Sequence, residues 1–582
     1  MKKGSDWLWL AAFIALWCAL RVFWIDADAG VPSLWEYGYN VTDEGYYMGA
    51  AKDKFLRGVF CDYAIGESFT YGYSPLTHWL AYVGYVIFGL SSWGWRVPFL
   101  ALYLAAWCLA FLYARRKCGN VMAFVWCAVF SSLPVVVAYE RTACNDVAIA
   151  ALATIAFCVA AGKGWWRIPA AAAVAGAICL VKPSIWVLLP LVAAGILSER
   201  KTRSAWIDIG LFVLVAAAAI GVWKELAVLS LKPEAALHGL TAAELIKRTT
   251  THNALPSLFD FNLLFRGVSS FPRDICLKSL GPAAPLVTLA PLAMALRDII
   301  SRRWSWRLLL YLSIPAYVAG VSTNNSICLH YYHPALLSLP ILFTTMDGDF
   351  EGGEVKARNR TQAATLLFAA AVAGLALLAA ISAPLAREVA AETFSTISNL
   401  PRKIVWTANW APCVLFAVAL SVVLAFSRGL RAAGVQAIAW LALGFCAASV
   451  AFSGIPGFKL SFFLKQSEAE WLAPMTISAI ASALFLALAF GLPATVFRRR
   501  AFLCFAPAAA LLSLVAVPSW RAGAVELLSA KSRVQREIAE EIAALIPDEA
   551  IVIGERARQI LMAKPQRTAT TMPGCDPIPI VK

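Results

Sequence analysis

The chain has 582 residues, of which 60% are hydrophobic and only 15% are charged. Soluble domains carry roughly 25% charged residues, and long apolar runs recur along this chain, so a soluble globular protein is excluded and a polytopic membrane protein is indicated. The formal net charge of +15 does not indicate nucleic-acid binding. Lys and Arg gather in short connections between the apolar runs, as membrane orientation requires.

The first apolar run, residues 7–25, follows two lysines and ends at Asp26. It is long for a signal peptide and lacks a small-residue cleavage site, so we interpret it as a retained membrane span. Counting the later runs against a roughly 30 Å bilayer core predicts about 13 to 15 transmembrane helices. The predicted spans are 7–25, 97–114, 121–138, 145–161, 168–181, 184–197, 206–224, 283–297, 308–321, 334–346, 361–382, 409–426, 433–453, 472–492 and 501–517.

Residues 75–90 are apolar enough to span a membrane, but His78 and several aromatic residues stand near their start. If this segment does not span, the basic connections fall on the same side as Lys2 and Lys3, which is the positive-inside pattern. We therefore predict that 75–90 is a helix or re-entrant segment at the outer interface. All five histidines then face outward, and the chemistry is expected on that face.

This orientation predicts a transmembrane domain over 1–517, with large extracytoplasmic loops at 26–96 and 225–282. Residues 518–582 form a small extracytoplasmic region, in which a helical pattern, a Pro-Asp turn, the strand-like "AIVIG" and a short helix follow one another. The predicted fold class is an all-α polytopic membrane protein with amphipathic helices at its outer face and a small α/β C-terminal piece.

Two adjacent acids, Asp43 and Glu44, stand in the first outer loop. The following residues have an apolar stripe at helical spacing that includes Ala50 and Phe55, with Asp53 facing elsewhere, which predicts an amphipathic helix on the membrane surface. The acids are then candidate catalytic groups at its N-terminus. The alternative is that they are ordinary first-turn acids, favoured there by the helix dipole.

Further candidates stand at the outer ends of predicted spans. Arg141 and Asp146 close a short outer turn, and an ionisable residue at the edge of a span is a functional candidate; the alternative for Asp146 is a helix cap. Lys182 precedes Pro183 at the junction of two short spans. It is a candidate partner for a phosphate, or a lysine that extends its side chain to the interface.

The stretch "LHYYHPALL" places His330, Tyr331, Tyr332 and His333 at the start of a span. The tyrosines and His333 are candidate substrate-binding residues, although interfacial aromatics are common for other reasons. The two histidines lack a fixed carboxylate partner, so no metal site is predicted. No cofactor is firmly implied, and a divalent metal remains an alternative.

The order of these motifs resembles the membrane-embedded glycosyltransferases of the GT-C fold, most closely the group that includes the protein O-mannosyltransferases and the lipid A aminoarabinose transferases. The acidic pair is followed by "YGYSPLTHWLAYVGYVIFG", "WRVPFLALYLAAWCLAFLYARRKCG", "ERTACND", "ICLVKPSIW" and "YYHPALL". The resemblance covers roughly residues 1–200 and, more loosely, 310–345.

The resemblance implies an integral membrane enzyme that moves a sugar from a polyprenyl phosphate to an acceptor on a protein, lipid or glycan. Asp43 matches the expected catalytic base, Glu44 the second acid of the pair, Asp146 an acid near the sugar or acceptor, and Lys182 a lysine near the lipid phosphate. The aminoarabinose transferases carry Lys-Pro-Pro-Leu where this chain has residues 73–76, "YSPL". This departure weakens the aminoarabinose and lipid A assignment and leaves sugar transfer intact.

A sugar phosphate already has a leaving group, so the enzyme needs a base for the acceptor and positive charge for the departing phosphate. Asp43 would be the base, and inversion at the anomeric carbon is expected. The predicted substrate-binding residues are Arg141, Lys182, His78, Tyr331, Tyr332, His333, Arg266 and Arg273.

A transporter or flippase of a lipid-linked substrate is the alternative, and it should show acids within spans and internal symmetry. Here the acids stand at outer span ends. The sequon at Asn40 also bears on the compartment, because a glycan beside Asp43 would obstruct it. This favours a bacterial inner membrane with a periplasmic active site over the endoplasmic reticulum.

Overall fold

A computed structural model describes part of the chain. The described residues are 6–22, 25–26, 44–58, 60, 74–132, 134–182, 189–198, 202–237, 241, 295, 306–322, 333–338, 340–342, 344–345, 534–548, 551–553, 561 and 564–569. Predicted spans beyond 346 lie outside them, as does 283–297 apart from Ala295. The chain divides into two compact units, the first comprising Met1–Phe261, Thr323–Ile341 and Ala522–Lys582, and the second comprising Asn262–Ser322 and Leu342–Arg521.

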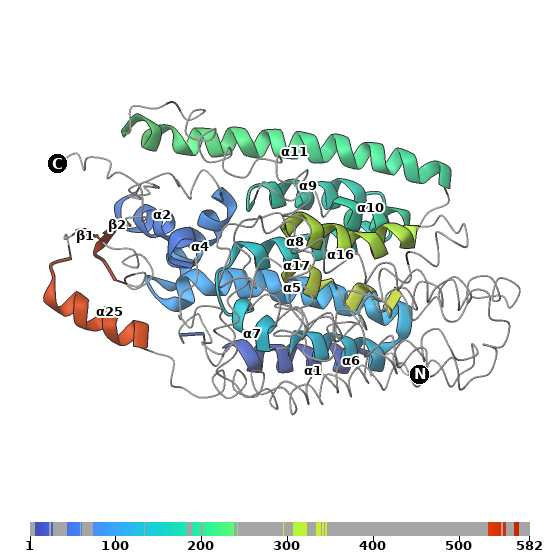
Figure 1. Cartoon of the computed structure of the whole chain (residues 1–582), viewed down its shortest axis with the longest axis horizontal. Coiled ribbons are helices and arrows are strands. Elements are labelled where there is room, and N and C mark those ends of the chain that lie inside the picture. Colours follow the sequence, from blue (N-terminus) through green and yellow to red (C-terminus); the bar gives the residue numbers. More distant parts are fainter. Residues whose placement is uncertain are drawn as a thin grey trace, which may run out of the picture. The chain divides into compact units, whose positions relative to one another are not determined.

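The described part of the chain is mainly helical, and Figure 1 shows its elements in sequence colours. The first unit contains α1 (Asp6–Arg21), α2 (Glu44–Arg57), α4 (Pro75–Phe88), α5 (Ser92–Cys118), α6 (Asn120–Ser131), α7 (Pro134–Glu140), α8 (Asn145–Ala160), α9 (Arg167–Cys179), α10 (Leu189–Leu197), α11 (Thr202–Leu237), α17 (His333–Leu337), α25 (Val534–Leu545), β1 (Ile551–Ile553) and β2 (Arg567–Ala569). The second contains α16 (Trp306–Ser322).

Each of the first seven predicted spans contains helix in its described residues, so the helical fold class is confirmed there. Among the described residues, α5 is the one helix long and apolar enough to cross a membrane by itself. Shorter apolar helices occupy Trp7–Arg21, Asn145–Ala160, Arg167–Cys179 and Trp206–Val222. The number of spans and their orientation stay predictions.

One predicted span is divided in the structure. The predicted span 121–138 is two helices, α6 and α7, because Pro134 has no N–H to continue the first helix and its fixed φ suits the first turn of a new one. The helix α11 continues to Leu237, past the end of the predicted span 206–224, and the start of the outer loop at 225 stays a prediction. With 36 residues, α11 is about 54 Å long, which exceeds a roughly 30 Å bilayer core.

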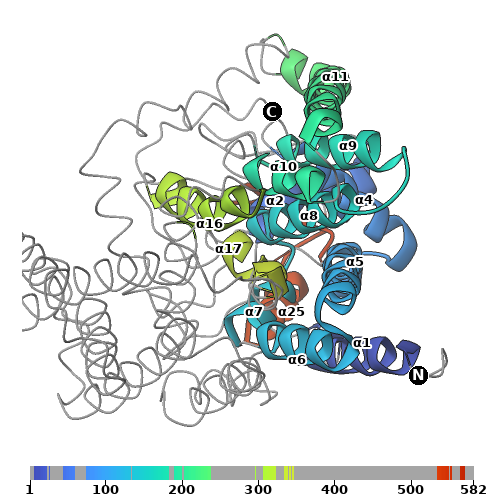
Figure 2. The same ribbon diagram turned by 90° about the vertical axis from the view of Figure 1, so that its right-hand side faces the viewer.

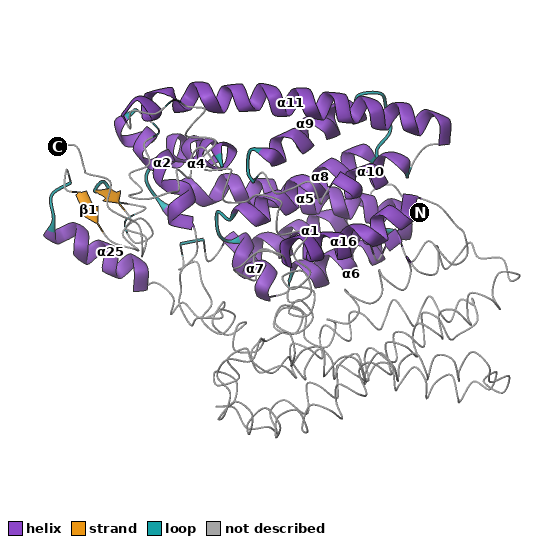
Figure 3. Cartoon of the chain, turned by 45° about the horizontal axis from the view of Figure 1, so that its top comes forward, coloured by secondary structure: helices purple, strands orange, loops and turns teal. Residues whose placement is uncertain are grey.

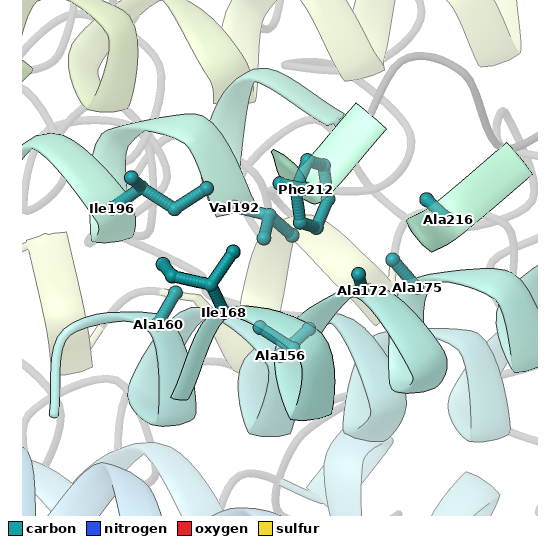
Figure 4. Close-up of a cluster of buried hydrophobic side chains, with 10 residues drawn as sticks. Ala156, Ala160, Ile168, Ala172, Ala175, Val192, Ile196, Phe212 and Ala216 are labelled. Carbon is teal, nitrogen blue, oxygen red and sulfur yellow. The ribbon is translucent and has the colours of Figure 1, made fainter. Parts of the chain in front are cut away.

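Small side chains hold α8, α9, α10 and α11 together (Figure 4). A Cβ added to Gly176 of α9 would lie 2.6 Å from the Cβ of Ala219 in α11, so this glycine permits the close approach of the two helices. Such packing of small residues is typical of helix pairs in membranes. The buried cluster comprises Ala156, Ala160, Ile168, Ala171, Ala172, Ala175, Val192, Ile196, Phe212 and Ala216.

The helices α4 and α5 pack backbone against backbone. A Cβ added to Gly84 would lie 1.7 Å from the carbonyl oxygen of Gly94, so no larger residue fits there without a shift. With 14 residues, α4 is about 21 Å long, short of the roughly 30 Å core. Figure 2 also shows α1 beside α6 in this unit.

The C-terminal segment is the part of the described chain that contains strands (Figure 3). The predicted order of helix, turn and strand is confirmed by α25 and β1. A second strand, β2, was not predicted; it pairs in parallel with β1, with Val552 opposite Thr568. The short helix predicted after β1 falls largely outside the described residues.

Candidate functional site

The turn between α7 and α8, residues 141–144, is the point where the described candidate residues meet. The helix α7 ends at Glu140 and α8 begins at Asn145. Side chains and backbone groups of residues 140–146 contact α1, α2, α4, α17 and the end of α9, as described below. Segments far apart in the sequence are therefore joined through seven consecutive residues, 140–146.

Glu44, the first residue of α2, is bound to this turn and to α5. Arg96 donates to both of its oxygens, from Nε to Oε1 and from Nη2 to Oε2, each at 2.8 Å. The indole N–H of Trp95 and the backbone N–H of Ala143 donate to Oε1, each at 2.9 Å. A bidentate guanidinium pair of this kind fixes geometry, so the carboxylate of Glu44 sets the position where α2 begins.

Arg141 is a buried cation beside this pair, with 2% of its surface exposed. Burial and the neighbouring Arg96 guanidinium lower the pKa of Arg141 to about 10, and the Glu44 carboxylate opposes this shift. The side chain therefore remains positively charged at neutral pH. It was predicted to bind substrate, and a buried cation in a turn can balance an incoming phosphate.

Glu140 lies at the centre of a second buried network. Arg21 of α1 donates from Nε to Oε2 at 2.8 Å, and Trp107 of α5 donates from Nε1 to Oε1 at 2.7 Å. The Nε2 of His333, on α17, is 3.5 Å from Oε1. Arg21 also donates to the carbonyl of Ser131 at 2.6 Å. His333, predicted to bind substrate, is thus placed against Glu140 with 1% of its surface exposed.

Asp146 and Lys182 form an ion pair, with Lys182 Nζ 3.0 Å from Asp146 Oδ1. The alternative role of Asp146 as a helix cap is not supported, because Cys144 is the N-cap residue of α8 and makes no side-chain cap hydrogen bond. The alternative for Lys182, a side chain extended into the interface, is also not supported, since 12% of its side chain is exposed and it is turned to Asp146.

A chain of neutral hydrogen bonds lies next to this pair. The Asn145 amide donates to Ser74 Oγ at 2.7 Å, and Thr77 Oγ1 donates to Asn145 Oδ1 at 2.6 Å. Ser74 Oγ in turn donates to the carbonyl of Val181 at 2.9 Å. These bonds join the starts of α4 and α8 to the residue before Lys182. The candidate His78 follows in the first turn of α4 and is fully buried.

The other predicted site residues, Asp43, Tyr331, Tyr332, Arg266 and Arg273, lie outside the described residues. Their roles stay predictions. In the described part of the chain, no group of three or more His, Cys, Asp or Glu side chains is placed to hold a metal ion.

Three charged residues of these networks were missed by the sequence analysis: Arg21, Arg96 and Glu140. A signal for them existed, because Arg21 lies inside an apolar run and Glu140 directly precedes Arg141 between two runs. A charge in such surroundings needs an opposite partner. The sequence offers no means of choosing that partner among the other charges.

The helix predicted after the acidic pair is confirmed as α2, but two charged side chains on its polar side are buried. Lys52 and Asp53 are 3% and 6% exposed, whereas Phe55 is 36% exposed. Lys52 is covered because the C-terminal segment packs against it, with Leu561 and Gln566 as its partners.

Residues 73–223 match the family described as dolichyl-phosphate-mannose-protein mannosyltransferase. This match covers about a quarter of the chain and includes the described candidates from His78 to Lys182. It confirms the resemblance to the GT-C glycosyltransferases that use polyprenyl-phosphate sugars, and it supports the class of membrane glycosyltransferase.

Two solved structures are similar to the whole chain. They are ArnT from Cupriavidus metallidurans in the apo state, with a TM-score of 0.49 and 15% identity, and the same protein bound to undecaprenyl phosphate, with a TM-score of 0.48 and 14% identity. Each comparison covers 99% of this chain and 87% of the other. At TM-scores below 0.5 these likenesses carry no argument about the site. No curated protein matches the chain.

Proposed function

We propose that the protein transfers a sugar from a polyprenyl phosphate to an acceptor hydroxyl or phosphate on a protein, lipid or glycan, at the extracytoplasmic face of the membrane and with inversion. One observation carries this proposal. The residues joined at the 140–146 turn combine a buried cation, Arg141, with a lysine–carboxylate pair, Asp146 and Lys182, inside the segment that matches the family.

The base in this proposal is Asp43. It directly precedes Glu44, whose carboxylate is held by Arg96, Trp95 and the backbone of Ala143. Glu44 is therefore a positioning residue, and the neighbouring acid is the one assigned to proton transfer. As the acceptor oxygen attacks the anomeric carbon, Asp43 takes its proton, the bond from that carbon to the phosphate oxygen breaks, and the lipid phosphate departs.

The departing phosphate needs positive charge, and Lys182 and Arg141 supply it in this proposal. Lys182 is paired with Asp146 in the structure. A phosphate dianion competes with that carboxylate for the ammonium group. When Lys182 turns to the phosphate, Asp146 is left beside the sugar, where a negative charge stabilises an oxocarbenium-like transition state.

The compartment proposed is a bacterial inner membrane with a periplasmic active site. Two features support it: the basic connections gather on the side of the N-terminus, and the sequon at Asn40 is close to Asp43. The donor carrier would then be undecaprenyl phosphate.

The decisive test is Asp43→Asn in the full-length protein in membranes, offered a panel of undecaprenyl phosphate sugars. We expect transfer to fall at least about 100-fold, as for the loss of a general base, with membrane insertion unchanged. Glu225→Gln makes the same change of charge at an exposed position of α11 and should transfer at the wild-type rate.

Undiminished transfer by Asp43→Asn would show that another group is the base. If the wild-type protein transferred no sugar but moved lipid-linked sugars across vesicle membranes, the alternative of a transporter or flippase would hold instead.

A further inference from the structure

The C-terminal segment is bound to the first-loop helix by one buried lysine. Lys52 of α2 donates from Nζ to the carbonyl oxygens of Leu561 and Gln566, each at 2.7 Å. At the end of α2, Arg57 donates to the carbonyl of Pro565 at 3.5 Å. Two carbonyls that flank the stretch before β2 thus converge on a single ammonium group from the other end of the chain.

Leu561 and Gln566, which accept the hydrogen bonds of Lys52, belong to a segment whose helix and strands contact one another. β2 pairs with β1, and the Gln566 side chain donates to the carbonyl of Ile546 and to Asp548 Oδ1, each at 3.3 Å, at the end of α25. Leu561 is fully buried. The Lys52 contact is therefore linked through Gln566 to α25 and to both strands.

Burial of a lysine is costly unless its donors are satisfied. Burial lowers the pKa of Lys52 to about 7, while the adjacent Asp53 carboxylate raises it and Arg57 lowers it. Either protonation state keeps at least two N–H groups for the two carbonyls. The contact is thus satisfied across the neutral range of pH, as expected of an anchor.

The opposite end of α2 is fixed at the candidate site. Glu44 and Lys52 are eight residues apart, about 12 Å along the helix axis. One end is held by Arg96 and the turn before α8, and the middle is held by the C-terminal segment. Since a helix of this length is stiff, both anchors contribute to the position of its first residue, Glu44.

We propose that Lys52 docks the C-terminal segment, residues 534–569, onto α2, and that this docked segment is a positioning element for Asp43. The segment braces the helix that directly follows the base in the sequence, and release of the anchor removes one of the contacts that fix α2, beside its packing on α4. Lys52 is a positioning residue; it acts through α2. The docking of the C-terminal segment does not depend on the proposed function. Its role in positioning Asp43 rests on that function.

Docking is tested in the full-length protein in lipid nanodiscs by hydrogen exchange. In Lys52→Met, the exchange of amides in β1 and β2 should rise at least about tenfold relative to wild type. The matched control is Lys54→Met, because Lys54 Nζ donates to the carbonyl of Gly58 at the end of its own helix. Its exchange in the strands should equal that of wild type.

A measurement on the wild-type protein covers the case in which Lys52→Met does not fold. Limited acylation of lysines at about pH 11, where both amines are mostly neutral, read by mass spectrometry, should modify Lys52 at least about ten times more slowly than Lys54, because Lys52 is 3% exposed. Equal reactivity of the two lysines would overturn the docking, as would wild-type exchange in a folded Lys52→Met.

Coupling to the site is tested by transfer kinetics. We expect Lys52→Met to lower kcat about tenfold and to leave the KM for the polyprenyl phosphate sugar unchanged, since Lys182 and Arg141 are not touched. Lys52→Arg, which keeps the charge and the donors, should recover most of the rate.

If the strands exchange faster and kcat does not change, docking stands and its role in positioning Asp43 is overturned. If the wild-type protein transfers no sugar, the proposed function fails, and the exchange and acylation results still decide the docking.

Discussion

Two ion pairs of the first unit, Glu44–Arg96 and Asp146–Lys182, differ in burial and in hydrogen bonding. Glu44 is 3% exposed and takes donors on both oxygens from Arg96, with further donors from Trp95 and Ala143. Lys182 meets Asp146 through Oδ1 at 3.0 Å, and 12% of its side chain remains exposed. The first pair is built to fix a helix. We propose that the second pair, whose lysine is partly exposed, exchanges its carboxylate for a substrate phosphate.

The largest effect is expected at the first pair. Arg96→Met leaves the Glu44 carboxylate buried without its guanidinium partner and should lower the free energy of unfolding by about 3–5 kcal/mol. Thermal unfolding in detergent measures this. Adding Glu44→Met should restore much of the stability, since removing both charges abolishes the unpaired one. The double variant should still transfer poorly, because α2 has lost its fixed start.

At the pair of Asp146 and Lys182 we expect a smaller effect on stability and a larger effect on the use of the lipid phosphate sugar. Lys182→Met should lower kcat/KM for the lipid phosphate sugar about 100-fold, equivalent to about 2.7 kcal/mol of transition-state stabilisation. Steady-state kinetics with purified protein provide the measurement. A loss of stability as large as that of Arg96→Met, with unchanged kinetics, would show that the pair of Asp146 and Lys182 also has a structural role and does not bind substrate.

Asp146→Asn tests whether Lys182 exchanges its carboxylate partner for the substrate phosphate. Without the carboxylate, Lys182 is held less firmly, so we expect undecaprenyl phosphate to bind several-fold more tightly. Sugar transfer should nevertheless slow by about tenfold, roughly 1.4 kcal/mol. Competition with a labelled lipid phosphate reports the affinity. Weaker binding of the lipid phosphate would contradict the exchange of Lys182 between Asp146 and substrate.

A further effect is a dependence of the free energy of unfolding on pH that stems from Lys52. Its pKa is lowered to about 7 in the folded protein, so between about pH 7 and the ordinary lysine pKa near 10.4 the unfolded chain binds more protons. Stability therefore rises with pH in this window, by at most about 1.4 kcal/mol per unit. Unfolding of wild type and Lys52→Met at pH 7 and pH 9 tests this, since the variant should lose that part of the increase.

Local features of the fold were predictable because the signals are local. Apolar runs predict helices, and each of the first seven predicted spans contains helix in its described residues. The break at Pro134 was also readable, since proline cannot continue a helix, but the run was interpreted as one span. The extension of α11 to Leu237 was not read from hydropathy, because Glu225, Lys232 and Glu234 interrupt the apolar residues of that part.

The sequence by itself determined the helical class, the family resemblance, and the candidates that stand at span ends, because hydropathy and motif order are properties of neighbouring residues. Only the tertiary structure decided the partners. Arg21 meets Glu140 across 119 positions, and Lys52 reaches Gln566 across 514. Which charges pair depends on how helices pack, and a buried charge accepts whichever opposite group or carbonyl the packing brings within reach. For that reason Glu44, predicted from the sequence to be the second acid of a catalytic pair, is held by Arg96 and the turn before α8, and the role of Asp43 as the base stays a proposal.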